Sequence, residues 1–274
     1  TVYQAVSLFD HVTVQSGDDW EITIEGSKAF GVPSDESNLA MRAARLLAQS
    51  AGVEDAVEIV VDKEIPVAGG MAGGSADAAA TLVACDELWG LGLSRDELAG
   101  IGASLGSDVP FLIHGGTAIG TGRGELITPV LMRGGYHWVF AADEIGLSTP
   151  QVYAELDRLR GDRAIEEPTT SPELLGALRS GDPQALAPHL RNDLQEAAIS
   201  LRPSLGGLID EGLSFGALAA IVSGSGPTVA YLAADHEGAI DLAVALTASG
   251  AVRNTYRATG PVQGATMRGV PRID

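Results

Sequence analysis

Hydrophobic and polar positions follow two different periods along residues 1–62, which predicts strands arranged around one helix. Residues 12–14 and 21–25 alternate at period two, as half-buried strands do. The polar segment 35–38 is typical of a helix start, and apolar residues then recur at helical spacing from Leu39 to Leu47. Residues 57–62 return to the strand pattern.

A dense run of glycines separates this strand from an alanine-rich helix. The run covers residues 66–77, and the helical pattern extends from Ala78 to about Trp89. Ser94 and Glu97 then have the spacing of a capping box, which predicts a further helix that we expect to end near Gly106. Because proline suits the first turn of a helix, the segment from 107 to 111 predicts the start of the next element. Residues 115–124 predict a glycine-rich hairpin or loop.

The pattern changes near residue 134, where we place a domain boundary. Residues 137–142 predict a buried strand, and Thr149 followed by Pro150 predicts a helix start. Residues 161–183 are rich in charge, proline and serine and predict an exposed loop with one short helix. Beyond them the chain predicts helices and a strand–turn–strand unit, over 184–199, 204–213, 219–231 and 237–249, and then a closing strand.

Composition narrows the class of protein. The chain has 274 residues and is 45% hydrophobic, so it can form a core, and its apolar runs fall far short of the ~18 residues of a membrane-spanning helix. We expect no signal peptide in residues 1–4, which lack a basic start and an apolar core. The single cysteine, Cys85, excludes an internal disulfide and favours the cytoplasm. The five histidines are scattered without paired metal-ligand spacing.

The charge is strongly negative and limits the partners. Seventeen basic against thirty-six acidic residues give −19, which argues against nucleic acid and against anionic membranes. A small phosphorylated ligand is compatible with this charge if backbone N–H groups, helix N-termini and a few cations hold it. The sequence leaves the oligomeric state open between monomer and homodimer.

The glycine run 66–77 is the strongest candidate for chemistry. Glycines let backbone N–H groups approach an anion, and the helix that follows adds its unpaired N–H groups and its positive dipole end. Gly69 and Gly74 have Walker A spacing, but Ser75 stands where that motif needs lysine. The alternative is a tight turn with close helix packing, although four glycines and Pro66 exceed what a turn requires.

Two further motifs each allow two interpretations. Asp108 is either a carboxylate at a helix start, stabilised by the dipole, or a general base for a substrate hydroxyl, and the two are compatible. Residues 223–226 are either a hairpin turn between apolar strands or a second glycine loop that closes over phosphates.

Residues 66–80, 105–111 and 223–228 together resemble, in order and spacing, three signatures of the GHMP kinase superfamily. Supporting similarity lies in residues 38–46, 62–66 and 120–125, and it extends over nearly the whole chain. The resemblance implies a two-domain α/β (α+β) fold. Residues 1–134 would form the ATP-binding domain, residues 135–274 would form a sheet with helices on one face, and the active site would lie in the cleft between them.

The resemblance also implies an activity and roles for named residues. Within the superfamily, the chain is most similar to enzymes that use ATP and Mg²⁺ to phosphorylate the 2-hydroxyl of a cytidine diphosphate-linked polyol in non-mevalonate isoprenoid synthesis. Asp108 would be the general base, and Thr149 would help to position it. Asn38 and Lys63 would lie near the adenine. The ATP phosphates would be held by Pro66, Val67, Ala68, Gly69, Gly70, Met71, Ala72, Gly73, Gly74, Ser75 and Ala76. The substrate would be bordered by Arg123 and Gly124 at its cytidine end, with Gly224 and Ser225 in the floor of the site.

The chain departs from the superfamily pattern in two places. Ala76 replaces a second hydroxyl and Asp77 stands where asparagine is common, so the metal ligands stay unassigned. The first signature, with a lysine near the base and a Tyr-His pair for cytosine, has no counterpart, and neither Lys28 nor Lys63 has the right position. Because the first residues resemble those that follow this pair, we expect the signature to precede Thr1.

Three alternatives stay open at this point. The first is a GHMP kinase that acts on homoserine or mevalonate. The second is a non-catalytic nucleotide-binding protein, should the natural chain begin at Thr1. The third is a dinucleotide oxidoreductase, which needs a G-x-G-x-x-G run after a strand that this sequence lacks.

Overall fold

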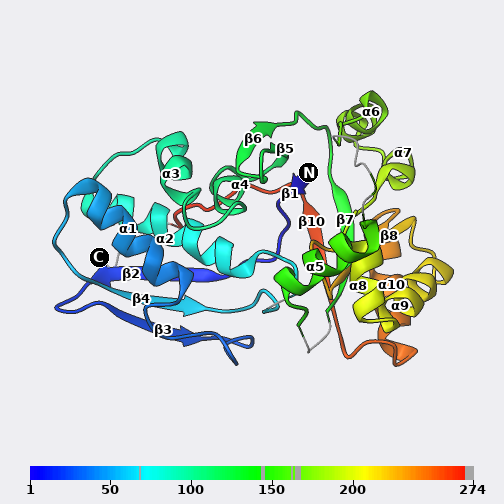
Figure 1. Cartoon of the computed structure of the whole chain (residues 1–274), viewed down its shortest axis with the longest axis horizontal. Helices are drawn as coiled ribbons and strands as arrows, with labels where there is room; N and C mark the ends of the chain where they lie inside the picture. Colours follow the sequence, from blue (N-terminus) through cyan, green and yellow to red (C-terminus); the bar gives the residue numbers. More distant parts are fainter. Residues whose placement is uncertain (68, 143–145, 162, 164–167, 269–274) are drawn as a thin grey trace. The chain divides into compact units, whose positions relative to one another are not determined.

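The computed structural model describes residues 1–67, 69–142, 146–161, 163 and 168–268, which form two compact units. The first unit contains residues 1–67, 72–129 and those from 262 on, and the second contains residues 69–71 and 130–261. Both units mix helices with sheets, which confirms the expected class (Figure 1). The expected family domains, 1–134 and 135–274, stay predictions.

A three-stranded sheet with two helices on one face builds most of the first unit. Its central strand runs antiparallel to one neighbour and parallel to the other, in the order β2-β4-β3. Helices α1 and α2 lie over one face of this sheet (Figure 1). Val57, Ile59 and Val61 of the central strand are buried in the core that the sheet and helices share, as the strand pattern predicts. The elements are β2 (His11–Ser16), β3 (Glu21–Glu25), α1 (Leu39–Ala51), β4 (Val57–Asp62) and α2 (Gly73–Trp89).

The helix starts predicted from capping residues are confirmed. The Asn38 side chain accepts a hydrogen bond from the Ala40 amide at 2.8 Å, so Asn38 caps α1. Ser94 and Glu97 form the reciprocal capping box of α3 (Arg95–Gly102). This helix ends at Gly102, four residues before the predicted Gly106. Gly102 also packs closely against the next helix, where a Cβ would lie 2.6 Å from Val109 Cγ1.

Helix α2 begins inside the glycine run, at Gly73, and the prediction that it starts at Ala78 was wrong. Glycine has a low helix propensity, which made residues 73–75 resemble a loop. Tertiary packing overrides that preference, since Ala78, Ala79, Leu82 and Cys85 are all fully buried along the helix. The chain enters the helix through Ala72, whose φ of 54° is left-handed.

A smaller antiparallel sheet completes the first unit. Its order is β1-β5-β6, and β5 and β6 form the hairpin predicted over the glycine-rich segment. The chain returns to this unit near its end, where Gln263 forms a bridge with Gly115 and the Ala265 amide donates to the Leu112 carbonyl. The elements are β1 (Val2–Gln4), α4 (Val109–His114), β5 (Thr117–Thr121) and β6 (Leu126–Pro129).

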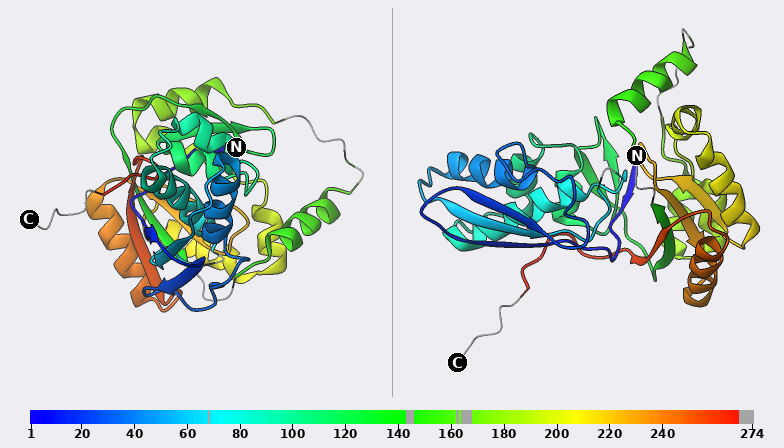
Figure 2. Two further views of the ribbon diagram at one scale, coloured as in Figure 1. Left: turned by 90° about the vertical axis from the view of Figure 1, so that its left-hand side faces the viewer. Right: turned by 90° about the horizontal axis from the view of Figure 1, so that it is seen from below.

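The second unit is a four-stranded antiparallel sheet covered by helices. Its order is β10-β7-β9-β8, and helices α9 and α10 contact the sheet (Figure 2). The buried strand 137–142 and the strand–turn–strand unit 219–231 are confirmed. The elements are β7 (Tyr136–Ala142), α5 (Thr149–Arg160), α6 (Pro172–Ser180), α7 (Pro183–Leu186), α8 (Gln195–Leu201), α9 (Ser204–Ser214), β8 (Ala219–Val222), β9 (Val229–Ala233), α10 (His236–Ala248) and β10 (Asn254–Gly260).

The continuous helix predicted over 184–199 was wrong. The structure has α7, a 3₁₀ turn over Ala187–His189, and then α8 from Gln195. Pro188 has no N–H to continue the helix, so the regular pattern ends there. Asn192 then leaves helical geometry and donates its Nδ2 group at 2.7 Å to the carbonyls of Val222 and Gly224. Between the 3₁₀ turn and α8 the chain therefore makes this long-range contact of Asn192 with the end of β8 and the turn that follows it, and it does not continue the helix.

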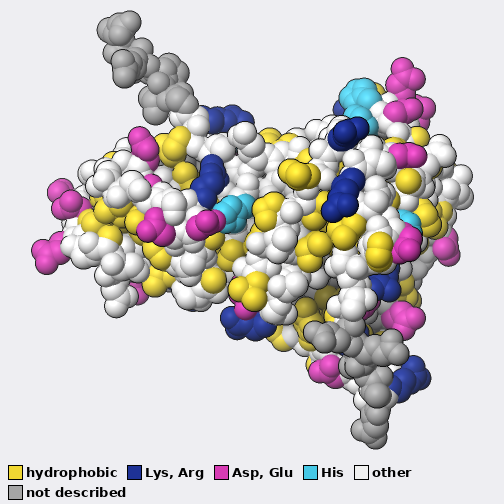
Figure 3. All heavy atoms as spheres, turned by 90° about the horizontal axis from the view of Figure 1, so that it is seen from above, with side chains coloured by type: hydrophobic (Ala, Val, Ile, Leu, Met, Phe, Trp, Pro, Cys, Tyr) yellow, Lys and Arg dark blue, Asp and Glu magenta, His cyan; other side chains and the backbone are white. Residues whose placement is uncertain are grey.

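Charged side chains are spread over the surface. On the face drawn in Figure 3, acidic side chains are dispersed and basic side chains are scattered among them. None of the described helices combines the length and the apolar character needed to cross a bilayer.

Candidate active site

The glycine run supplies unpaired backbone donors at the start of α2. The amides of Gly73, Gly74 and Ser75 form no hydrogen bond with any described residue, as expected in a first helical turn. The helix behind them is 17 residues long, so its dipole adds to the positive potential there. This end of α2 is therefore suited to an anion such as a phosphate group.

The preceding glycines pack against the turn between β8 and β9 within the second unit. The Ser223 hydroxyl donates to the Gly70 carbonyl at 2.9 Å, and the Thr228 amide donates to the Gly69 carbonyl at 3.4 Å. Gly70 has φ +71°, and a Cβ there would lie 2.2 Å from the Ser223 carbonyl oxygen. The structure thus joins two glycine-rich motifs that the sequence singled out separately.

Thr149 and Ser225 meet in the second unit. The two hydroxyl oxygens lie 2.8 Å apart, with Thr149 at the first position of α5 and Ser225 in the same β8–β9 turn as Gly224. Asn192 holds this turn through the Gly224 carbonyl. Thr149 and the 223–228 motif therefore belong to one hydrogen-bonded cluster, and the predicted help of Thr149 in positioning Asp108 stays a prediction.

Asp108 stands immediately before α4 and does not use its carboxylate as a cap. Its Oδ1 accepts a hydrogen bond of 3.1 Å from the Tyr3 hydroxyl. Gly106, two residues earlier, lies beside the start of α2, since a Cβ there would be 3.8 Å from Ser75 Oγ. The half-buried carboxylate accepts this one hydrogen bond among the described residues, and its role as a base stays a prediction.

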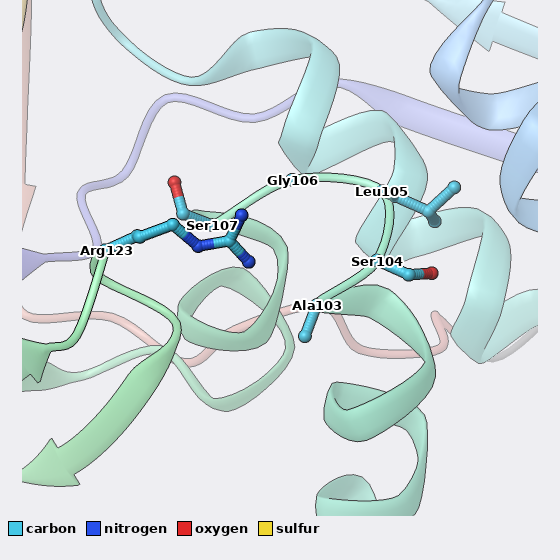
Figure 4. Close-up of a pocket in the computed structure, with 6 residues that line it drawn as sticks. All are labelled: Ala103, Ser104, Leu105, Gly106, Ser107 and Arg123. Carbon is cyan, nitrogen blue, oxygen red and sulfur yellow. The ribbon is translucent and has the colours of Figure 1, made fainter.

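A hollow of about 280 Å³ lies next to Asp108 in the first unit. In Figure 4 the Arg123 side chain extends toward the loop that precedes Asp108. Gly124 lets the β5–β6 turn approach Tyr3, because a Cβ on Gly124 would lie 2.3 Å from the Tyr3 hydroxyl. The hollow is lined by Ala103, Ser104, Leu105, Gly106, Ser107 and Arg123.

Lys63 is buried in an ion triad with two carboxylates. Its side chain is 2% exposed, and its ammonium pairs with Asp10 and, at 2.8 Å, with Asp77. Burial raises the pKa of Asp77 to about 7, while the Lys63 charge acts in the opposite direction. The Lys63 backbone also forms hydrogen bonds with the backbones of Glu25 and Lys28. These contacts give Lys63 a structural task, and its assignment to ATP stays a prediction.

Other predicted residues are also bonded within the protein or lie outside what the structure describes. The Asn38 amide nitrogen donates to the Pro33 carbonyl at 2.7 Å while its oxygen caps α1, so its link to adenine stays a prediction. Ala68 lies outside the described residues. The loop before α2 contains Pro66, Val67 and Met71, and the first turn of α2 contains Ala76, close in sequence to the unpaired amides.

Sequence reasoning missed Tyr3 and Asp10. Tyr3 carries no motif, and only the fold brings it to Asp108. Asp10 could have been inferred from Lys63, because a lysine at the end of a buried strand needs a carboxylate partner.

The described residues contain no group of three or more His, Cys, Asp or Glu side chains that could hold a metal ion. Asp77 has a buried oxygen without a partner among the described residues, but its other oxygen binds the Lys63 ammonium. A cation beside that ammonium would be repelled. A divalent ion would therefore depend on the phosphates of a nucleotide and on the Ser75 hydroxyl, a donor set that Mg²⁺ accepts.

Comparison with known proteins agrees with these motifs. Family models described as "GHMP kinases N terminal domain" and "GHMP kinases C terminal" match residues 38–116 and 174–252. A 4-diphosphocytidyl-2-C-methyl-D-erythritol kinase of Salinispora arenicola is 57% identical over 269 residues, covering 97% of this chain and 85% of that protein. The protein of the same name from Rhodococcus jostii is 53% identical over 267 residues, covering 97% and 86%.

Solved structures share the fold. A crystal structure of a 4-(cytidine 5'-diphospho)-2C-methyl-D-erythritol kinase has a TM-score of 0.74 and 28% identity, covering 94% of this chain and 88% of that one. A homoserine kinase from Cytophaga hutchinsonii has a TM-score of 0.76 at 18% identity, covering 96% and 89%, which shows the fold alone. The two-domain α/β fold expected from the sequence is confirmed, and the chain belongs to the GHMP kinase family of small-molecule kinases.

Proposed function

We propose that this chain transfers the γ-phosphoryl group of ATP to the 2-hydroxyl of 4-diphosphocytidyl-2-C-methyl-D-erythritol. The choice of substrate rests on one observation, which is an identity above 50% with kinases of that name over nearly the whole chain. The unpaired amides at the start of α2 support the nucleotide part of the proposal. Cys85, buried and the single cysteine, suits a reducing cytoplasm, where we place the protein.

The glycine loop and the first turn of α2 would hold the ATP phosphates. Backbone amides are uncharged donors that keep a fixed direction, so they bind a polyanion although the chain carries −19. Mg²⁺, when bound, would neutralise charge between the β- and γ-phosphates, with the Ser75 hydroxyl as the available protein ligand. Arg123 and Gly124 would border the cytidine end of the substrate, as the family pattern implies.

Asp108 would act as the general base. Its carboxylate accepts the proton of the 2-hydroxyl as that oxygen bonds to the γ-phosphorus and the bond to the bridging oxygen of ADP breaks. Such a transfer needs positioning and charge stabilisation more than covalent chemistry by the protein. We assign to Thr149 and Ser225, bonded at 2.8 Å, the task of orienting the reacting groups.

The proposal predicts that Asp108→Asn lowers kcat by about 10²–10⁴-fold, the typical loss of a general base. The isosteric amide still accepts the Tyr3 hydrogen bond, so the thermal midpoint should change little. Steady-state assays on the natural full-length protein measure the effect. An Asp108→Asn enzyme with normal kcat would refute the assignment of the base.

The substrate is tested separately. ATP-dependent phosphorylation is measured with 4-diphosphocytidyl-2-C-methyl-D-erythritol, homoserine and mevalonate under the same conditions. We expect turnover of the first compound alone. Turnover of homoserine or mevalonate alone would overturn the proposed substrate but leave the kinase activity standing. If the protein binds ATP but turns over none of the three compounds, a non-catalytic nucleotide-binding protein would be favoured.

A further inference from the structure

The carboxylate of Asp108 has a single partner among the described residues, and that partner is Tyr3. Asp108 makes no capping bond to α4. An ionised carboxylate only accepts hydrogen bonds, so the Tyr3 hydroxyl is the donor over the 3.1 Å to Oδ1. This bond occupies one oxygen and leaves Oδ2 as the oxygen available to a substrate hydroxyl.

The Tyr3 ring is itself held from several sides. Strand pairing of Tyr3 with Ala118 fixes its backbone. Its ring stacks on Phe111, with centroids 4.8 Å apart and planes 18° from parallel. Phe111 is buried in α4 and follows Asp108, the residue immediately before this helix, by three residues, so one tyrosine contacts two residues about one turn apart.

Two glycines of the β5–β6 hairpin provide the room for this ring. A Cβ on Gly120 would lie 2.5 Å from Tyr3 Cε2, and one on Gly124 would lie 2.3 Å from the Tyr3 hydroxyl. Both distances are shorter than any real Cβ contact, so larger residues at either position would displace the tyrosine. The β5–β6 hairpin and α4 therefore hold the Tyr3 side chain in one orientation, with its hydroxyl bonded to Asp108.

We propose that Tyr3 is a positioning residue that holds the Asp108 carboxylate, through Oδ1, in the orientation in which Oδ2 accepts the substrate proton. The proposal rests on the proposed function, since it takes Asp108 as the general base. A carboxylate without this bond would rotate about its side-chain torsions, and the productive orientation would have to be selected at each turnover.

Tyr3→Phe tests the proposal, because it removes the hydroxyl and keeps the ring on Phe111. We expect kcat to fall about 10-fold, as for the loss of a hydrogen bond to a charged group, while KM for ATP and the thermal midpoint stay nearly unchanged. Tyr256→Phe, at a half-buried tyrosine of β10 to which no role in the reaction is assigned, is the matched control and should leave kcat unchanged.

A double-mutant cycle separates action through Asp108 from direct action on the substrate. If Tyr3 acts through Asp108, Tyr3→Phe has no further effect on single-turnover rates in the Asp108→Asn background. An equal loss in both backgrounds, or an unchanged kcat in Tyr3→Phe alone, would overturn the proposal. These results are distinct from failure of the proposed function, which would be a fully active Asp108→Asn enzyme.

Discussion

At the scale of single residues, Asp77 has the most unusual environment. Its side chain is 3% exposed, it shares the Lys63 ammonium with Asp10, and its Oδ1 has no partner among the described residues. Two buried carboxylates for one ammonium leave a net negative charge, and burial raises the pKa of Asp77 to about 7. The triad lies directly behind the start of α2, since a Cβ on Gly73 would be 3.3 Å from Lys63 Nζ.

This environment predicts a pH-dependent effect of Asp77→Asn on stability. A carboxyl whose pKa is raised from 3.8 to about 7 by folding stabilises the protein below the lower value and loses that contribution as pH rises through the upper one. The variant has no such loss. Its free energy of unfolding relative to wild type should therefore increase between about pH 4 and pH 7.

Urea unfolding at several pH values measures this difference. Asp55→Asn, at an exposed loop position, is the control and should run parallel to wild type. A constant difference between Asp77→Asn and wild type over the whole range would contradict the prediction.

Lys63→Met should destabilise the protein by about 3–5 kcal/mol at neutral pH, because it leaves both carboxylates buried without a cation.

At the scale of elements, the segment from Gly69 to Ser75 serves two structures at once. Its first part is bonded to the β8–β9 turn through Ser223 and Thr228, and its last part is the first turn of α2. Ala72, between the two, is the one non-glycine residue with positive φ in the described chain. We infer that this backbone is held in shape from both ends before a nucleotide arrives.

Gly70→Ala should disturb this segment strongly. A left-handed φ of +71° is unfavourable for alanine by about 1–2 kcal/mol, and its Cβ would also clash with the Ser223 carbonyl oxygen. We expect a raised KM for ATP and a lowered thermal midpoint. Gly92→Ala is the matched control, because φ is +69° there and nothing lies within 4 Å of the new Cβ. Equal effects of the two variants would show that the clash with Ser223 is unimportant.

At the scale of the whole molecule, the charge of −19 opposes the folded state. Like charges that are spread over the surface repel one another over the Debye length, which is about 30 Å at 10 mM salt and about 8 Å at 150 mM. Binding of a nucleotide must occur against the same field. In the proposed function, the local amides and Arg123 would supply the attraction that the molecule as a whole does not.

Added salt should consequently stabilise the protein. Raising NaCl from about 10 mM to 150 mM is expected to raise the thermal midpoint by about 2–4 °C, which corresponds to about 1 kcal/mol. Differential scanning calorimetry at a fixed scan rate measures the shift, and KCl should give the same value because screening does not depend on the ion. A falling midpoint would mean that favourable ion pairs outweigh the repulsion.

Much of the local structure could be predicted, because it depends on residues close together in the chain. Short spacings in the sequence predicted the helix caps at Asn38 and Ser94, and the alternation of apolar and polar residues predicted the strands. The predictions failed where packing overrode a local preference, as at the glycine-rich start of α2 and at Asn192, whose side chain bonds the Val222 and Gly224 carbonyls.

The order of the three motifs determined, from the sequence by itself, the kinase family, and it predicted the place of the phosphate loop. Only the tertiary structure decided which distant residues meet: Lys63 with Asp10, 53 positions apart, Asp108 with Tyr3, 105 apart, and Gly70 with Ser223, 153 apart. The physical reason is that a local pattern encodes periodicity and backbone freedom, whereas a buried charge or an oriented carboxylate finds its partner only when the whole chain packs.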